Sequence, residues 1–217
     1  KEAAIEIVEK LKPGDRLSVV AFDHRASGIV SNQLVDEPDR VKNLIQQLTA
    51  NGGTDIDSGL KIAIQEIAVG QQNAVSQIFL LTDGENEHGD NDRCIKLAQL
   101  ASEYNITINT LGFGANWNQD VLETIADCAR GTLAYIETPE KVLQTFEKLF
   151  TRARSIGLTN AYLMIELMTQ IRLAELKPIA QVTPETIEIQ IQQEGNYLAI
   201  RLGDLAIDLE RIILINL

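Results

Sequence analysis

Short, nearly continuous apolar runs that alternate with amphipathic stretches constrain the fold of this chain more than any other feature. The runs are Arg16–Phe22, Ser76–Thr82, Thr107–Phe113 and Thr132–Ile136. Runs of this length are typical of strands that are buried on both faces. The stretches with helical periodicity are Glu2–Leu11, Pro38–Leu48, Asp57–Gly70, Asp90–Tyr104, Asn118–Arg130 and Pro139–Ala153. Strand followed by helix, repeated up to Arg154, predicts an α/β fold with a mostly parallel sheet covered by helices on both faces.

One further strand is expected at Ser27–Val30, directly after Arg16–Phe22. The connection is too short for the crossover that parallel neighbours require, so this strand should be antiparallel and lie at the sheet edge. Gly131 is expected to end the helix Asn118–Arg130, because glycine favours the left-handed position after a helix.

The pattern changes after Arg154. The remaining runs are β-branched or alternate apolar with polar residues: Leu158–Met168, Ile171–Leu176, Thr186–Ile191, Tyr197–Arg201 and Arg211–Leu217. Such runs predict antiparallel strands. We therefore expect two parts, an α/β domain at 1–153 and a small antiparallel β module at 158–217. The junction between them is short, so the module should pack on the domain.

The charge balance bears on which partners the chain can bind. Its formal net charge of −12 and its lack of Lys and Arg clusters argue against binding to nucleic acid or to anionic lipid. No apolar run is long enough to span a membrane. The two cysteines, Cys94 and Cys128, are too few for a disulfide framework and are interpreted as small buried hydrophobic residues.

Oxygen-bearing side chains follow the strands at two places where a ligand would bind. Open α/β sheets bind ligands beyond the carboxyl ends of their parallel strands. Thr54 follows two glycines and precedes a helix, and Asp83 directly ends a buried strand and is followed by Gly84. Hydroxyl and carboxylate oxygens are ligands of hard cations such as Mg²⁺. Thr54 and Asp83 are therefore candidate metal ligands.

Other polar residues in these loops have simpler interpretations. Asp55 and Asp57 are expected to cap a helix or to support the site, with Asp57 or Ser58 at the cap of the following helix. His24 and His88 are interpreted as solvated loop residues. The stretch that begins at Asp83 lacks the spacing of a calcium-binding loop, and Asp90, Asn91 and Asp92 should cap a helix.

Motifs for catalysis and nucleotide binding are missing. The segment Gly112–Trp117 lacks the third glycine of a dinucleotide-binding fingerprint. The sequence contains no Gly-x-Ser-x-Gly and no His-Glu-x-x-His, and it has two histidines. We therefore predict that the chain is not an enzyme and has no catalytic or organic-cofactor site.

Several pieces, in order, resemble the von Willebrand factor A family. They are Asp15–Phe22, Asn51–Ile56, Ile78–Gly84, Thr110–Gly114 and Ile125–Ala126 ahead of Gly131. The resemblance covers residues 1 to about 153. It implies a Rossmann-like fold and a protein-interaction module of the adhesion type. Family members of this cysteine-poor kind imply a bacterial, cytoplasmic protein.

The resemblance also implies a metal-ion-dependent adhesion site, abbreviated MIDAS. In that family Mg²⁺ or Mn²⁺ is bound by an Asp-x-Ser-x-Ser loop, by a Thr that matches Thr54 and by an Asp that matches Asp83. A partner's carboxylate often completes the coordination. The given sequence contains no Asp-x-Ser-x-Ser. We therefore expect weak metal binding by residues 1–217 alone, with the site empty or filled by water.

The family's first strand, which lies between those matching Arg16–Phe22 and Ser76–Thr82, is also outside the given sequence. We expect its place to be taken by a strand from another copy in an intertwined homodimer, by direct pairing of the two flanking strands, or by preceding residues. An alternative to the adhesion function is a structural or assembly role with a vestigial metal site.

Overall fold

The computed structural model describes residues 1–49, 51–70, 74–114, 116–136, 139–168, 170–175, 178–183, 187–188, 191–207 and 209–217. The chain divides into two compact units, Lys1–Ala153 and Arg154–Leu217. No helix in the described ranges is long and apolar enough to cross a membrane.

A parallel three-stranded sheet forms the centre of the first unit. Its strands are β3 (Ser76–Thr82), β4 (Ile106–Phe113) and β5 (Leu133–Ile136), in the order β3-β4-β5. Both pairings are parallel, with Ile78 opposite Ile108 and Leu111 opposite Ala134. The prediction of parallel strands is confirmed for these three segments.

Strand β1 (Arg16–Phe22) lies in a different sheet. It pairs antiparallel with β2 (Ala26–Leu34), and within the described residues neither strand hydrogen-bonds to β3, β4 or β5. The antiparallel pairing of the two strands is confirmed, but the expectation that Arg16–Phe22 shares one sheet with the three parallel strands, with the antiparallel strand at the edge of that sheet, is wrong. Direct pairing of β1 with β3 is thereby excluded in this structure. The split falls between the two segments that the resemblance predicts to flank a further strand.

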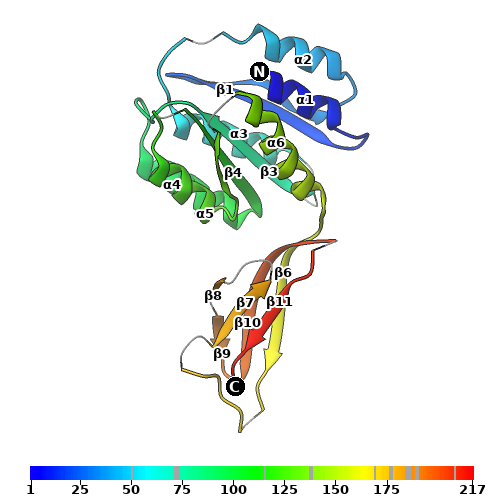
Figure 1. Ribbon diagram of the computed structural model, residues 1–217, viewed down its shortest axis with the longest axis vertical. Coiled ribbons are helices and arrows are strands. Elements are labelled where there is room, and N and C mark those ends of the chain that lie inside the picture. The colour runs from blue at the N-terminus through cyan, green and yellow to red at the C-terminus, as the bar shows by residue number, and fades with distance from the viewer. Residues whose placement is uncertain are drawn as a thin grey trace. The chain divides into compact units, whose positions relative to one another are not determined.

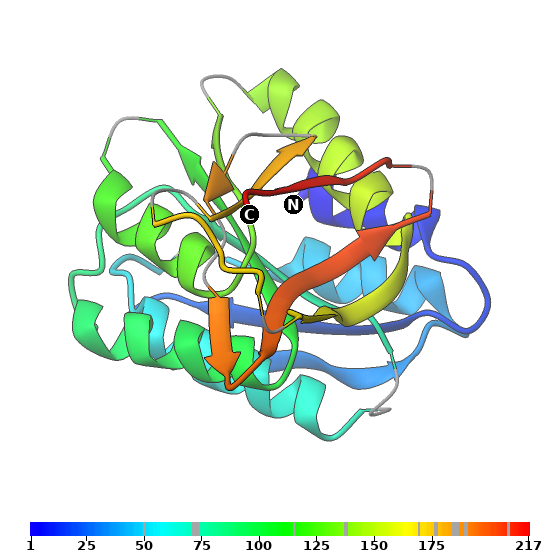
Figure 2. The same cartoon turned by 90° about the horizontal axis from the view of Figure 1, so that it is seen from below.

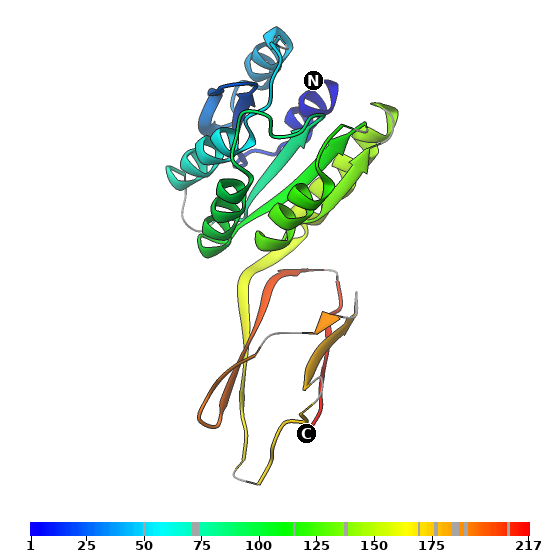
Figure 3. The same ribbon diagram turned by 90° about the vertical axis from the view of Figure 1, so that its left-hand side faces the viewer.

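Helices cover both faces of the first unit (Figures 1 and 3). They are α1 (Glu2–Lys10), α2 (Pro38–Gln47), α3 (Ile56–Ala68), α4 (Asn91–Glu103), α5 (Gln119–Cys128) and α6 (Pro139–Arg154). Alternate residues of β3 face opposite layers, as a strand's two-residue period requires. Ile78 and Leu80 join a core cluster with α3, α4 and α5, whereas Phe79 and Leu81 pack with Phe146 of α6. A third cluster joins α1 and α2 to β1 and β2.

Gly131 was expected to be a left-handed residue that ends α5, but the structure requires a glycine there for a different reason. The left-handed residue after α5 is Arg130, with φ 59°. A Cβ on Gly131 would overlap the backbone carbonyl of Ile108 in β4. The expectation of a left-handed glycine is therefore wrong, and Gly131 instead permits close approach of two backbone segments.

The second unit consists of two small antiparallel sheets (Figures 1 and 2). One has the order β6-β10-β9 and the other the order β11-β7-β8. The bounds are β6 (Ile156–Glu166), β7 (Ile179–Thr183), β8 (Ile187–Glu188), β9 (Ile191–Glu194), β10 (Tyr197–Ala206) and β11 (Ile212–Ile215). Ile179, Leu198 and Ile200 are fully buried between them.

The tail differs from the sequence expectation in two places. Residues 171–175 contain no strand, although one was expected at Ile171–Leu176, and the strand Ile179–Thr183 was not expected. The run Thr186–Ile191 contains β8 and the start of β9, and its residues 186, 189 and 190 lie outside the described part. How this unit packs on the first stays a prediction.

Candidate metal and partner site

Three loops meet at the carboxyl edge of the sheets in the first unit. A Cβ on Gly53 would lie 2.6 Å from Cδ2 of His88 and 3.2 Å from Cβ of His24. The loop after β1, the loop before α3 and the loop after β3 are therefore in contact. In the first of these, the backbone N–H of Arg25 donates to the carboxylate of Asp23 (2.8 Å) and lowers the pKa of that group.

Thr54 lies beside the backbone that directly follows Asp83. Its Oγ1 would be 2.9 Å from a Cβ on Gly84, so this glycine leaves room for the hydroxyl. The backbone N–H of His88 donates to the carbonyl oxygen of Thr54 (3.0 Å). Asp83 itself directly follows β3 and is exposed. The structure thus brings the two loops together, while the role of Thr54 and Asp83 as ligands stays a prediction.

Asp55, and not Asp57 or Ser58, caps helix α3. Its Oδ1 accepts a hydrogen bond from the backbone N–H of Ser58 (3.0 Å). Burial alone would raise the pKa of Asp55, but its hydrogen bonds from Ser58 and the charge of Arg93 lower it below its ordinary value. The capping interpretation is therefore confirmed for Asp55 and wrong for its two neighbours.

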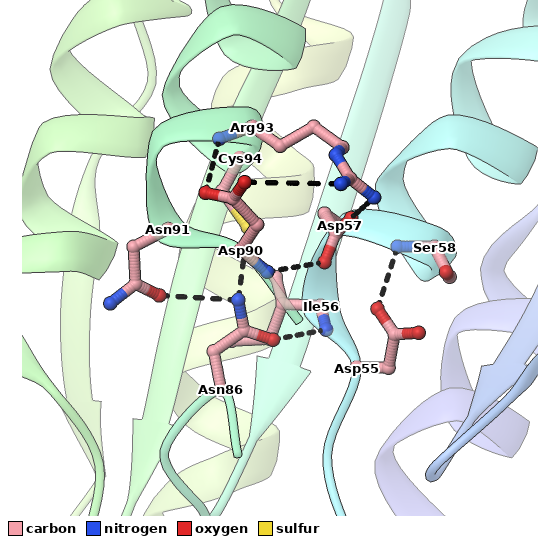
Figure 4. A network of polar contacts seen from close by, with 9 residues as sticks. All are labelled: Asp55, Ile56, Asp57, Ser58, Asn86, Asp90, Asn91, Arg93 and Cys94. Carbon is pink, nitrogen blue, oxygen red and sulfur yellow. Dashed lines mark hydrogen bonds and ion pairs between the residues drawn. The ribbon is translucent and has the colours of Figure 1, made fainter. Parts of the chain in front are cut away.

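Asp57 connects the starts of α3 and α4 (Figure 4). Its side chain is buried, its Oδ2 lies 2.9 Å from Nη1 of Arg93, and its Oδ1 accepts from the backbone N–H of Asp90 (2.9 Å). Asp90 caps α4 as expected, by accepting from the backbone N–H of Arg93. Since a buried carboxylate is costly unless it is paired, this ion pair and hydrogen bond account for an aspartate in this position.

Asn86 joins the loop after β3 to both helices (Figure 4). Its Oδ1 accepts from the backbone N–H of Ile56 (2.8 Å), a group that a helix start otherwise leaves unpaired. Its Nδ2 donates to Oδ1 of Asn91 (3.1 Å) and to Sγ of Cys94 (3.5 Å). Burial, together with Asp57, Asp55 and Asp90, raises the pKa of the Cys94 thiol to about 12.

The sequence pattern gave no indication of a role for Asn86 or Arg93. An asparagine in a loop and an arginine in the first turn of a helix are each common, and their partners lie about 30 positions away in the chain. The one local signal was Gly89 directly before the cap Asp90. A Cβ on Gly89 would overlap both Oδ1 of Asn86 and Oδ1 of Asp57.

The side-chain oxygens of Thr54 and Asp83 are of the chemical type that a divalent cation binds. A hydroxyl and a carboxylate oxygen suit Mg²⁺ or Mn²⁺, and the missing side chain of Gly84 leaves the hydroxyl of Thr54 uncovered on that side. Within the described residues, however, no group of three or more His, Cys, Asp or Glu side chains could hold a metal ion. Thr54 and Asp83 could thus supply only part of the six oxygens that Mg²⁺ requires.

Comparison with known proteins identifies the family. Residues 1–149 match the family described as von Willebrand factor type A domain. An uncharacterized protein of Synechocystis sp. is 54% identical over all 217 residues. The chain spans about half of that relative, 52% of its length. The chain belongs to the von Willebrand factor type A family, whose members are generally protein-interaction modules.

Solved structures show the same fold. The von Willebrand factor type A protein from Catenulispora acidiphila matches 98% of this chain and 50% of its own, with a TM-score of 0.80 at 21% identity. Proximal thread matrix protein 1 of the mussel byssus, with a zinc-occupied MIDAS motif, matches 76% of this chain and 43% of its own, with a TM-score of 0.58 at 17% identity. Some members of the family therefore bind a divalent metal at this kind of site.

Proposed function

We propose that the chain is an adhesion-type interaction module that holds a partner's carboxylate through Mg²⁺ or Mn²⁺, with Thr54 and Asp83 as ligands. The observation that carries this proposal is the position of the Thr54 hydroxyl against Gly84, directly after Asp83 at the end of β3. When bound, the cation would supply the positive charge that a partner's carboxylate requires. Thr54 and Asp83 would hold and orient it at the sheet edge.

The charge of this edge supports a role for a cation. Exposed acids gather in and after the loop that follows β3: Asp83, Glu85, Glu87, Asp90 and Asp92. A partner's carboxylate would be repelled by such a surface, because like charges at close range raise the free energy of the complex. A bound cation reverses this effect locally, so binding of an acidic partner should require the metal.

The experiment is calorimetric titration of Mg²⁺ and Mn²⁺ into the full-length protein that contains this chain. Asp83→Asn and Thr54→Ala should each weaken metal binding at least tenfold, because even the loss of a group that only supports a ligand typically costs tenfold or more. Glu85→Gln is the matched control, because it removes one charge from the same loop without removing a proposed ligand. Equal binding by Asp83→Asn and wild type would refute the proposal.

Residues 1–217 alone provide a second test. With two proposed ligands from the protein, Mg²⁺ should bind weakly, because this ion gives up its water reluctantly. Sub-micromolar binding by this segment would show that the required ligand set is different.

A role in assembly is the second candidate, and one observation favours it. Tyr162 and Met164 lie on alternate positions of β6 and are exposed by 48% and 61%, and Leu158 of the same strand is 63% exposed. Exposed apolar side chains that share one face of a strand are typical of a protein contact. Partner binding that survives Asp83→Asn but is lost in Tyr162→Ser with Met164→Ser would favour this function over the metal-dependent one.

The division into two sheets supports a proposal about the chain's own association. β1 and β3 each pair with one neighbouring strand among the described residues. We propose that one more strand lies between them, contributed either by another copy or by residues outside this sequence. Analytical ultracentrifugation of residues 1–217 distinguishes the two sources: a dimer supports an intertwined homodimer, and a monomer at all concentrations excludes it.

A further inference from the structure

Two helix starts are joined by one buried carboxylate. Asp57, in the first turn of α3, is 2% exposed, and it pairs with Arg93 in the first turn of α4. The side chain of Arg93 is 64% exposed, and its Nη2 also lies 3.8 Å from Oδ2 of Asp90. Movement of either helix start would therefore separate a buried negative charge from its partner.

The proposed metal ligands lie in the two segments that lead into these helices, the loop before α3 and the loop between β3 and α4. Three hydrogen bonds connect them: His88 N–H to the carbonyl of Thr54 (3.0 Å), Ile56 N–H to Asn86 (2.8 Å), and Asp90 N–H to Asp57 (2.9 Å). Thr54 lies in the loop before α3, and Asp83 is the first residue of the loop between β3 and α4. Figure 4 shows the second and third of these bonds. The distance between the hydroxyl of Thr54 and the loop at Asp83 depends on all three.

We propose that Asp57, Arg93 and Asn86 are positioning residues that fix the loop of Asp83 against Thr54 and thereby set the affinity of the cation site. The inference rests on the proposed function, since it concerns the same site. Groups that orient metal ligands without touching the metal typically change its affinity by tenfold or more when they are lost. None of the three residues needs to contact the cation.

Charge and position predict opposite results for one substitution. Arg93→Gln removes a positive charge near the site and leaves the Asp57 carboxylate without its partner. If charge alone mattered, the added negative potential would tighten cation binding. If Arg93 acts through position, the loosened loop weakens binding despite that potential. The sign of the change in affinity therefore separates the two explanations.

The experiment measures Mn²⁺ affinity and amide hydrogen exchange on the full-length protein, at a temperature well below unfolding. Arg93→Gln should weaken Mn²⁺ binding about tenfold and should accelerate exchange at His88 and Asp90 without metal. Arg93→Lys, which keeps the charge and can reach Asp57, should restore most of both. Lys96→Gln is the matched control, because it removes one positive charge from the same helix and should leave exchange in the loop unchanged.

The outcomes separate this inference from the proposed function. Unchanged or tighter Mn²⁺ binding in Arg93→Gln, with binding still weakened at least tenfold by Asp83→Asn, overturns the positioning role and leaves the metal site standing. Metal binding that does not depend on Asp83 overturns the proposed function instead. If Arg93→Gln proves too unstable, Asn86→Ala tests the attachment of the same loop through its hydrogen bond with Ile56, with the same expected loss of affinity and the same result contradicting it.

Discussion

Two loops at the carboxyl edge of the parallel sheet are held in place by different physical means. The β3 loop, residues 83–90, is connected to α3 and α4 by hydrogen bonds and by the ion pair of Asp57 with Arg93. The β4 loop, residues 114–118 without 115, is held by Trp117. That indole covers Gly112, lies with its centroid 5.7 Å from the ring of Tyr135, and donates to the carbonyl of Gly114 (2.9 Å).

The difference shows what each kind of contact can support. Aromatic packing removes area from water and tolerates small shifts, because the hydrophobic effect has no direction. Hydrogen bonds and buried ion pairs fix direction and distance, and they lose most of their value after a small displacement. A loop that presents exposed carboxylates to a cation needs defined distances, and the polar contacts of the β3 loop provide them.

Among substitutions that test this difference between the two loops, Gly89→Ala should lower the free energy of unfolding the most. The new Cβ would overlap Oδ1 of both Asn86 and Asp57, so two hydrogen bonds to the helix starts would be lost and a buried carboxylate would lose a partner. We expect the free energy of unfolding to fall by about 3 kcal/mol, measured by urea denaturation.

Gly114→Ala is the control for Gly89→Ala. Gly114 lies in the β4 loop with φ 70°, and a Cβ there would meet nothing within 4 Å. Its cost should be limited to backbone strain of about 1 kcal/mol. Equal losses for the two variants would show that the polar contacts around Gly89 contribute little.

Trp117→Ala should have the next largest effect. It removes a half-buried indole from Gly112 and Tyr135, and a loss of about 2 kcal/mol is expected, below the range for a fully buried tryptophan. Hydrogen exchange in the β3 loop should stay unchanged if the two loops are held independently. Tyr135→Phe keeps the ring contact and should change stability by less than about 0.5 kcal/mol. Faster exchange at His88 in Trp117→Ala would contradict the separation of the two loops.

The sequence predicted the elements better than their association. Continuous apolar runs identified β3, β4 and β5 because burial on both faces leaves a distinct composition. The same composition at β1 could not reveal that it pairs only with β2 among the described strands, since pairing depends on which strand lies next to it. In the tail, Ile171–Glu175 has an apolar content similar to that of a strand, and its composition did not reveal that it forms none.

Candidate ligands could be named from the sequence where one residue carries the signal, whereas contacts in which two distant residues must meet were missed. Thr54 after two glycines and Asp83 after a buried strand are each recognisable locally. The pairing of Asp57 with Arg93 joins residues 36 positions apart, and the contact of Asn86 with Ile56 spans 30. Such contacts follow from the packing of α3 beside α4, which periodicity does not specify.

Helix caps should produce a smaller effect that depends on pH in one case. Asp55→Ala should lower stability by about 1 kcal/mol at pH 7, as should Asn118→Ala, which removes the cap of α5. The folded-state pKa of Asp55 lies below its ordinary value of 3.8. Its contribution is therefore present above pH 3.8 and is lost as the pH falls through the folded-state value.

Denaturation at pH 7 and at pH 3 provides the measurement. The cost of Asp55→Ala should shrink at the lower pH, whereas the cost of Asn118→Ala should stay the same, because an amide does not titrate. A pH-independent cost for Asp55→Ala would mean that its charge does not contribute to the cap.

The smallest effect on the native protein concerns the two cysteines, one beneath the β3 loop and one on the helix after the β4 loop. Cys94 is fully buried and its thiol pKa is raised to about 12, so roughly one molecule in ten thousand carries the reactive thiolate at pH 8. Cys128 is partly exposed. Native iodoacetamide labelling followed by mass spectrometry should therefore modify Cys128 well before Cys94, and Arg93→Gln should shorten the delay by loosening the loop above Cys94. Simultaneous labelling of both cysteines in the folded protein would show that the polar contacts of the β3 loop open as readily as the surface of α5.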